Sequence, residues 1–319
     1  MRLEGDFARG SEGPAFVPAG NRGSAIQAPE SCRSILAPYP RLSRSNARRT
    51  SAGVPADLFD MRARAIRRDR AFKQGPELFL YERAFEDCLE RIALQDRSFL
   101  SCLQIGCPDP NWPARLGEVS AAVQVADPGP LFANAAGGVA ILEDSWSPPM
   151  GEFDLCVAIG TLDSINDLPR ALQTIRHSLK DNSLLIGAVA GGNSLPQLRS
   201  AIHAANQVMG ASSPHVHPRI EAAAVTPLLT ASGFVKPVVD VDRVQVTYSS
   251  LEKLVSDLRG MAATNILNAR SRRALSRTAK DSAAAAFENA AEGGRTTETF
   301  EIIHFAAWTP SAGENREQG

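Results

Sequence analysis

The chain has 319 residues, of which 44% are apolar, and its formal net charge at pH 7 is −1. This length is enough for one substantial hydrophobic core of about 250 residues with tails, and the near-neutral charge argues against a dedicated nucleic-acid binder. The five cysteines form no C-x-x-C pair, and no apolar run approaches the ~20 residues that span a bilayer. The sequence therefore predicts neither a disulfide framework, a zinc site nor a transmembrane segment, and we expect a soluble protein.

The N-terminal part of the chain divides into two segments. Residues 1–55 are rich in glycine, proline, serine and arginine without sustained periodicity, so we expect a disordered extension. Residues 56–95 are predicted to be helical, with a basic helix at 58–73 and an amphipathic helix at 78–92. The arginines of the basic helix are typical of a solvated helix face. The alternative is a patch for an acidic partner or for peripheral contact with a membrane surface.

A sheet is predicted to begin near residue 96, with strands at 99–105, 121–126 and 138–142. The clearest pattern follows: an apolar strand at 153–160, a helix that begins at Asn166-Asp167-Leu168-Pro169, a turn at 181–183 and a second buried strand at 184–189. A strand, a helix and a strand joined by short connections make a βαβ unit. Such a unit predicts a parallel sheet with helices on its faces.

The rest of the chain adds helices and late strands. Helices are predicted at 195–208, 225–231, 251–261 and 272–290, a strand or bent pair of strands at 234–248, and a last strand at 297–308. Residues 96–310 are therefore expected to form one α/β domain with a doubly wound, mostly parallel sheet. A helical insertion at about 250–292 precedes the last strand, and residues 311–319 are expected to be a loose tail.

Acidic residues follow the ends of the predicted strands. Asp127 comes about 20 residues after Gly106, close to the spacing at which a carboxylate accepts both hydroxyls of a ribose in dinucleotide folds. Glu143 and Asp144 follow the third strand, where a carboxylate could accept from an adenine amino group. Ligands of doubly wound folds bind beyond the carboxyl ends of the strands, so these acids and Gly160 mark the candidate site. Ordinary loop acids are the alternative interpretation.

Further motifs lie downstream of this site. They are Asn166-Asp167-Leu168-Pro169-Arg170-Ala171-Leu172, Gly191-Gly192-Asn193-Ser194-Leu195, Ser213-Pro214-His215-Val216-His217-Pro218, Ser232-Gly233-Phe234 and Asp257-Leu258-Arg259-Gly260-Met261. With these motifs, residues 58–310 resemble the class I S-adenosylmethionine-dependent methyltransferases. More narrowly, the chain resembles the family of the methyltransferase-like complex I assembly factor and the malonyl-carrier-protein methyltransferases.

The resemblance implies a seven-stranded Rossmann-like sheet and S-adenosylmethionine as cofactor, bound by Gly106, Asp127, Glu143, Asp144 and Gly160. It also implies methyl transfer to a protein or carrier-protein substrate. A respiratory-chain subunit is a further candidate partner, since the mitochondrial assembly factor is implicated in arginine hydroxylation of a complex I subunit. The expected compartment is the cytoplasm of a bacterium, or the mitochondrial matrix if the source is eukaryotic.

The loop after the first strand departs from that family. Where the family has acid-x-Gly-x-Gly-x-Gly, this chain has Gln104-Ile105-Gly106-Cys107-Pro108-Asp109-Pro110-Asn111-Trp112, so Gln104 replaces the acid and two prolines fix the backbone. After the fourth strand, Leu162-Asp163-Ser164 stands where the family has Leu-His-Trp. The second hypothesis is therefore a non-catalytic assembly factor or chaperone that has lost cofactor binding. A nicotinamide-dependent oxidoreductase is disfavoured because Gly-x-Gly-x-x-Gly is absent.

Histidines and a second basic segment supply the remaining candidates. His215 and His217 could ligate a metal, but no third ligand is apparent nearby and no metal is predicted. His215 matches the family's motif and is the candidate acid or base. The basic segment at 270–280 is expected to be a solvated helix or, alternatively, a docking face for a protein partner.

Overall fold

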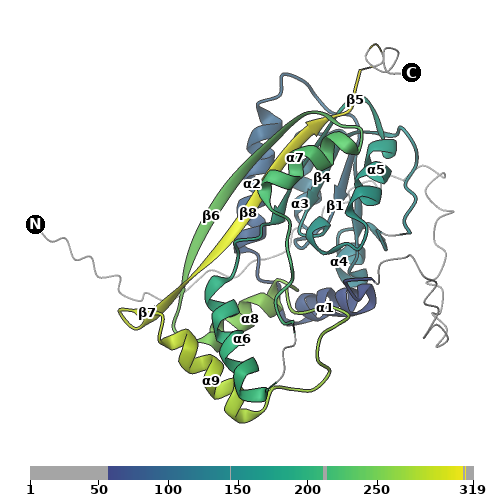
Figure 1. Ribbon diagram of the computed structural model, residues 1–319. Helices are drawn as coiled ribbons and strands as arrows, with labels where there is room; N and C mark the ends of the chain where they lie inside the picture. The colour runs from purple at the N-terminus through teal and green to yellow at the C-terminus, as the bar shows by residue number, and fades with distance from the viewer. Residues whose placement is uncertain (1–56, 144, 211–213, 312, 314–319) are drawn as a thin grey trace, which may run out of the picture. The chain divides into compact units, whose positions relative to one another are not determined.

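The computed structural model describes residues 57–143, 145–210, 214–311 and 313. The predicted disordered extension at 1–55, the candidate Asp144 and most of the predicted tail lie outside these described residues. Within them, helices flank a central twisted sheet (Figure 1).

The sheet is mostly parallel, as predicted. Its strands run in the order β3-β2-β1-β4-β5-β8-β6, and a two-residue strand, β7, pairs with β8 off this path. Strands β1 to β5 are parallel to one another, whereas β8 pairs antiparallel with both β5 and β6. The strand bounds are β1 (Cys102–Ile105), β2 (Val123–Asp127), β3 (Val139–Ala140), β4 (Phe153–Ile159), β5 (Leu179–Ala190), β6 (Val235–Tyr248), β7 (Ala291–Glu292) and β8 (Arg295–Trp308).

Helices cover both faces of this sheet and the ends of its strands. Their bounds are α1 (Met61–Gln74), α2 (Phe79–Ala93), α3 (Trp112–Leu116), α4 (Pro130–Ala135), the short 3-10 helix η2 (Leu162–Ser164), α5 (Leu168–Ser178), α6 (Pro196–Met209), α7 (Ala222–Ala231), α8 (Leu251–Gly260) and α9 (Arg277–Glu288). None of the helices that the structure describes combines the length and the apolar character needed to cross a bilayer.

The βαβ unit formed by β4, α5 and β5 confirms the strongest prediction. Asp167 caps α5 by accepting from the Arg170 N–H at 3.0 Å, and Leu172 and Ile175 are buried on the face toward the sheet. The predicted turn at 181–183 is wrong, because β5 continues through it as a bulge. The register with β4 shifts between Phe153 and Leu155 at that point, and Asn182 takes a φ of +53°.

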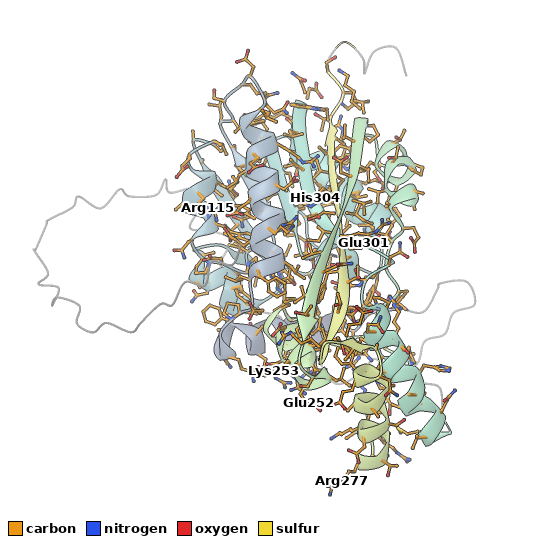
Figure 2. All side chains as sticks on the ribbon, turned by 90° about the vertical axis from the view of Figure 1, so that its left-hand side faces the viewer. Arg115, Glu252, Lys253, Arg277, Glu301 and His304 are labelled. Atoms are coloured by element: carbon orange, nitrogen blue, oxygen red, sulfur yellow. The ribbon has the colours of Figure 1, made fainter. Side chains whose placement is uncertain are left out.

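The core lies in layers on the two faces of the sheet. One cluster joins β4 and β5 to α5 and α7, and a second joins the other face to α2 and α3. Cys88, Cys102 and Cys156 are all buried in these layers, and burial raises the pKa of the Cys88 thiol to about 12. Figure 2 shows α2 running alongside β6 and β8, where Asp87 of α2 lies 2.9 Å from Nδ1 of His304 on β8.

A third cluster lies where β6 and β8 extend past the rest of the sheet. It joins α6, α8 and α9, and Figure 1 shows these three helices together at one end of the sheet. The predicted helix at 272–290 begins later than expected, at Arg277, because the Ser276 hydroxyl accepts from the Ala279 N–H and caps it there. The predicted strand or bent pair at 234–248 is one strand, β6.

Candidate functional site

The four described residues of the candidate cofactor site lie at one edge of the sheet. Gly106 directly follows β1, Asp127 is the last residue of β2, Glu143 follows β3 and Gly160 directly follows β4. Because these strands are parallel, their carboxyl ends meet at the same edge. The structure therefore brings together residues that are up to 54 positions apart between Gly106 and Gly160.

Both glycines are required by close packing. Gly106 has a φ of +82°, and a Cβ atom there would lie 2.2 Å from the carbonyl oxygen of Ile159. Gly160 has a φ of +67°, and its Cβ would lie 2.5 Å from Cε1 of Tyr81 on α2. A side chain fits at neither position, so the β1 and β4 ends approach each other and α2 without one.

Asp127 is fully buried and its carboxylate accepts four hydrogen bonds. Its oxygens accept from the backbone N–H groups of Cys107 at 2.7 Å and Gly129 at 2.6 Å. Arg68 of α1 donates to the same two oxygens from Nε at 2.8 Å and from Nη2 at 2.5 Å. Burial alone would lower the pKa of Arg68, but the charge and hydrogen bonds of Asp127 outweigh burial and raise it above its ordinary value.

Glu143 has an equivalent arginine partner. Nη1 of Arg64, one helical turn before Arg68, lies 2.8 Å and 2.7 Å from the two carboxylate oxygens of Glu143. Nη2 of Arg64 also donates to the Thr161 carbonyl oxygen at 2.7 Å, just beyond β4. Both members of this pair are buried, so α1 is joined by ion pairs to the ends of β2 and β3.

The spacing of α1 explains how both arginines reach the sheet. Asp60 begins the helix by accepting from the Ala63 N–H at 2.9 Å, and residues four apart then share one face. The prediction of a solvated basic face holds for Arg62 and Arg70, which are exposed, and is wrong for Arg64 and Arg68. Figure 1 shows α1 beside α8 and α4 at this edge.

These contacts decide how a nucleoside could fit. The two carboxylates are hydrogen-bond acceptors at the strand ends, where a ribose and an adenine would need acceptors. In this arrangement, however, their oxygens already accept from Arg68 and Arg64. The residues therefore fit the nucleoside of S-adenosylmethionine only once the two guanidinium groups have withdrawn from the acids.

The side chains of the loop after β1 turn away from the strand-end acids. Gln104, which replaces the family's acid, is buried and donates from Nε2 to the Gly106 carbonyl oxygen at 3.3 Å. Trp112 is turned into the core, where its ring stacks on Phe85 with centroids 4.1 Å apart and planes 5° apart. Its Nε1 donates to Glu82 at 2.9 Å. Through Trp112, the loop after β1 thus packs against α2 as part of the hydrophobic core.

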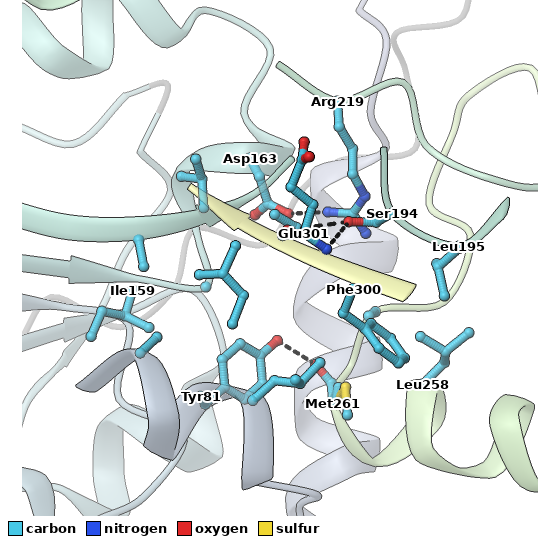
Figure 3. Close-up of a pocket in the computed structure, with 18 residues that line it drawn as sticks. Tyr81, Ile159, Asp163, Ser194, Leu195, Arg219, Leu258, Met261, Phe300 and Glu301 are labelled. Carbon is cyan, nitrogen blue, oxygen red and sulfur yellow. Dashed lines mark hydrogen bonds and ion pairs between the residues drawn. The ribbon is translucent and has the colours of Figure 1, made fainter. Parts of the chain in front are cut away.

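An apolar cavity adjoins this edge. Figure 3 shows it bounded by α2, by the ends of β4 and β5, by α8 and by β8. At one wall, Asp163 Oδ2 lies 2.5 Å from Nη1 of Arg219. Tyr81 and Gly160 line both this cavity and a smaller one beside Arg64 and Arg68, so the two spaces are neighbours. Sequence reasoning assigned no site role to Tyr81, Asp163 or Arg219.

Both candidate histidines line a groove beside α6, but only His217 also lines a cavity beside the arginines of α1. His215 lines a groove with Leu198 and Ile202 of α6, and it does not line the cavities beside the strand-end acids. His217 is buried, accepts from the Ile266 N–H at 3.0 Å and lines the small cavity next to the arginines. Across residues 57–143, 145–210, 214–311 and 313, no group of three histidine, cysteine or acidic side chains is arranged to bind a metal ion.

His217 makes stability depend on pH. Burial, and then the charge of Arg219, lower the pKa of His217 to about 4. An unfolded histidine titrates near 6.5, so the unfolded state gains protons first, and the stability present above about pH 6.5 is lost as the pH falls toward 4. The total loss approaches about 3 kcal/mol. We expect His217→Gln to cost stability at pH 7 and clearly less at pH 4.5, as measured by urea unfolding.

The control for this prediction is His203→Gln, because His203 is exposed on α6. The cost of this variant should be small at both pH values, because an exposed side chain contributes little to stability. A cost of His217→Gln that is equal at pH 7 and pH 4.5 would contradict the assignment.

Comparison with known proteins finds relatives for part of the chain. Residues 78–236 match the methyltransferase domain family. Mouse mitochondrial arginine-hydroxylase NDUFAF5 is 36% identical over 178 residues, which are 53% of this chain and 51% of that protein. Malonyl-[acyl-carrier protein] O-methyltransferase of Laribacter hongkongensis is 28% identical over 187 residues, 59% of this chain and 61% of that protein. The chain thus spans about half the length of the NDUFAF5 relatives that it matches.

A solved structure agrees with the fold. A Bacillus halodurans protein described as a candidate methyltransferase superposes with a TM-score of 0.50 at 11% identity, over 71% of this chain and 99% of that one. Residues 78–236, which match the family, include β1 to β5, the acids at their carboxyl ends and the helices between them. Residues 78–236 therefore form a domain of the methyltransferase family.

Proposed function

We propose that this protein is a methyltransferase that uses S-adenosylmethionine and modifies a protein or a group carried on a carrier protein. The observation that carries the proposal is the pair of buried carboxylates, Asp127 and Glu143, at the ends of neighbouring parallel strands beside an apolar cavity. The names of the relatives support both substrate classes, since one acts on arginine and the other on a malonyl group of a carrier protein.

Each residue of the site has a proposed task. Asp127 would accept from the ribose hydroxyls and Glu143 from the adenine amino group, in place of Arg68 and Arg64. Gly106 and Gly160 let the ends of β1 and β4 pack against each other and against Tyr81, which shapes the edge of the sheet where the ligand would lie. When bound, the cofactor supplies an activated methyl group, and the neighbouring cavity would hold the group that receives it.

Calorimetric titration with S-adenosylmethionine tests this function. We expect a saturable heat, and at a ligand concentration of about 100 times Kd the unfolding free energy should rise by about 2.7 kcal/mol. Asp127→Asn should abolish the heat. No heat and no thermal shift at millimolar ligand would reject the proposal.

A second candidate is a non-catalytic assembly factor, possessing the fold but not the cofactor. The specific observation in its favour is that both carboxylates already form ion pairs with arginines of the same chain. In addition, Gln104 stands where the family has an acid. This candidate predicts no cofactor binding together with retention by an immobilised respiratory-chain subunit. Pull-down with a peripheral-arm subunit would test that partner directly.

A further inference from the structure

The two basic segments predicted from the sequence meet in the structure. The helix α1 packs against α8 (Figure 1), and the loop before α9 reaches back 210 positions, where Nη2 of Arg270 lies 2.7 Å from Oδ2 of Asp60. Five arginines thereby gather into what we call the basic surface. Its members are Arg67 and Arg70 of α1, Arg259 in the last turn of α8, and Arg270 and Arg272 of the loop that precedes α9.

Three of these arginines lack a counter-ion. Arg67, Arg70 and Arg259 form no ion pair with any acid in the part of the chain that the structure describes. Arg70 and Arg259 are exposed, whereas Arg67 is half-buried. Partial burial lowers the pKa of Arg67, and the charges of three neighbouring arginines add to this effect, which Asp60 opposes only in part. Positive charge is thus crowded here without compensation.

The nearby acids already have other partners. Oδ2 of Asp60 lies between two members of the basic surface, 2.7 Å from Nη2 of Arg270 and 3.6 Å from Nη2 of Arg272. Asp69, the acid within α1, is directed toward α4, where it accepts from the Leu131 N–H at 3.0 Å. The basic surface therefore has an excess of positive charge on a chain whose net charge is −1. Such a local excess attracts an anionic partner and steers its approach.

The surroundings of the basic surface indicate which anion fits. Asp60 shows that a carboxylate can lie between two of its guanidinium groups, and the planar guanidinium matches a carboxylate through paired hydrogen bonds. Ile66, directly before Arg67, is 49% exposed and offers an apolar contact beside the charges. It is the one large apolar side chain exposed on α1, all of which the structure describes, whereas a helix that inserts into lipid presents an apolar face. These features favour a protein segment over a membrane.

We propose that the basic surface is a docking site for an acidic segment of a partner protein, whose carboxylates pair with Arg67, Arg70 and Arg259. An apolar side chain of the same segment packs on Ile66. The inference goes beyond the proposed function and does not depend on cofactor binding. The docked segment lies on α1, the helix whose buried arginines hold the acids at the strand ends.

The test is fluorescence anisotropy of the full chain, without cofactor, with a labelled glutamate-rich peptide that contains one leucine. The reference probe is the same peptide with glutamine in place of every glutamate. We expect the glutamate peptide to bind at least about tenfold more tightly at an ionic strength of about 0.1 M, and to lose affinity as salt screens the charges. Arg67→Gln and Arg259→Gln should each weaken its binding by about two- to fivefold, and the double variant by about tenfold.

The matched control is Lys180→Gln, which removes an exposed cation at the amino end of β5, and its affinity should equal that of the parent protein. Arg67→Gln relieves repulsion among the arginines, so this variant should unfold at the same or a higher temperature, and unfolding cannot then explain its weaker binding. Equal affinity for the two peptides, unchanged affinity in the double variant, or an equal loss in Lys180→Gln would overturn the proposal. Tighter binding to phosphatidylglycerol vesicles or to a single-stranded DNA oligonucleotide than to the glutamate peptide would also overturn it.

Discussion

Replacing Asp127 with asparagine is expected to lower the free energy of unfolding by about 3–5 kcal/mol, the range observed when one partner of a buried ion pair is removed. The asparagine oxygen can still accept from a backbone N–H, but Arg68 is left as a buried cation without its anion. Arg68→Met should cost a similar amount, because it strands the Asp127 carboxylate. Urea unfolding of both variants at pH 7 measures the two effects.

The double variant separates the ion pair from the backbone hydrogen bonds. If the pair is the main contribution, the combined cost of Arg68→Met and Asp127→Asn should be smaller than the sum of the single costs by up to about 3 kcal/mol. The matched control is the pair of Arg83 and Asp242, which has the same two-bonded geometry but is largely exposed. Arg83→Met should cost less than about 1 kcal/mol.

Additive costs at Arg68 and Asp127 would show that the two side chains do not interact in solution. An ion pair would then not join α1 to the end of β2. The same variants also bear on function. Under the proposed function, a cofactor would have to replace the arginines on these acids, so the energy that couples Arg68 to Asp127 would be subtracted from the apparent cofactor affinity.

The sheet could be predicted from the sequence because its signals are local. The apolar run at β4, the Asp167 cap and the helical spacing of α5 all lie within one βαβ unit. The positions of Asp127 and Glu143 follow from the same signals, since a residue just after a parallel strand must lie at its carboxyl edge.

The partners of those acids could not be predicted in the same way. Arg68 and Asp127 are 59 positions apart, and Arg64 and Glu143 are 79 apart, so no local pattern links them. The face of α1 that turns inward is also unusual, because it carries two arginines while Ile66 lies on the exposed side at 49% exposure. Apolar periodicity alone would turn this helix the other way.

One smaller error, the predicted turn at 181–183, has a chemical cause. Asp181, Asn182 and Ser183 are favoured in turns, but the same residues tolerate a bulge with positive φ, and pairing with β4 and β8 keeps the strand going. The loop after β1 departs from the family's glycine-rich loop in Gln104 and in two prolines, and this departure is the basis of the hypothesis of lost cofactor binding. In the structure, Trp112 belongs to the core of α2.

That placement of Trp112 leads to the second large effect. Trp112→Ala should lower the free energy of unfolding by about 3–5 kcal/mol, because a fully buried indole leaves a large cavity and Phe85 loses its stacking partner. Trp112→Phe keeps most of the apolar contact and should cost clearly less. Trp146, which is only partly buried against the other core cluster, provides the matched control, and Trp146→Ala should cost less than Trp112→Ala.

Trp112 lines neither the apolar cavity nor the smaller one beside Arg64 and Arg68, so its removal should leave the affinity for S-adenosylmethionine unchanged at a temperature where the variant is folded. Titration of the Trp112→Phe variant, which retains more stability, gives the same comparison with less risk of unfolding. A gain in cofactor affinity in either variant would mean that the indole reaches the nucleoside position in solution. The arginines of α1 would then not be the main obstacle to a cofactor.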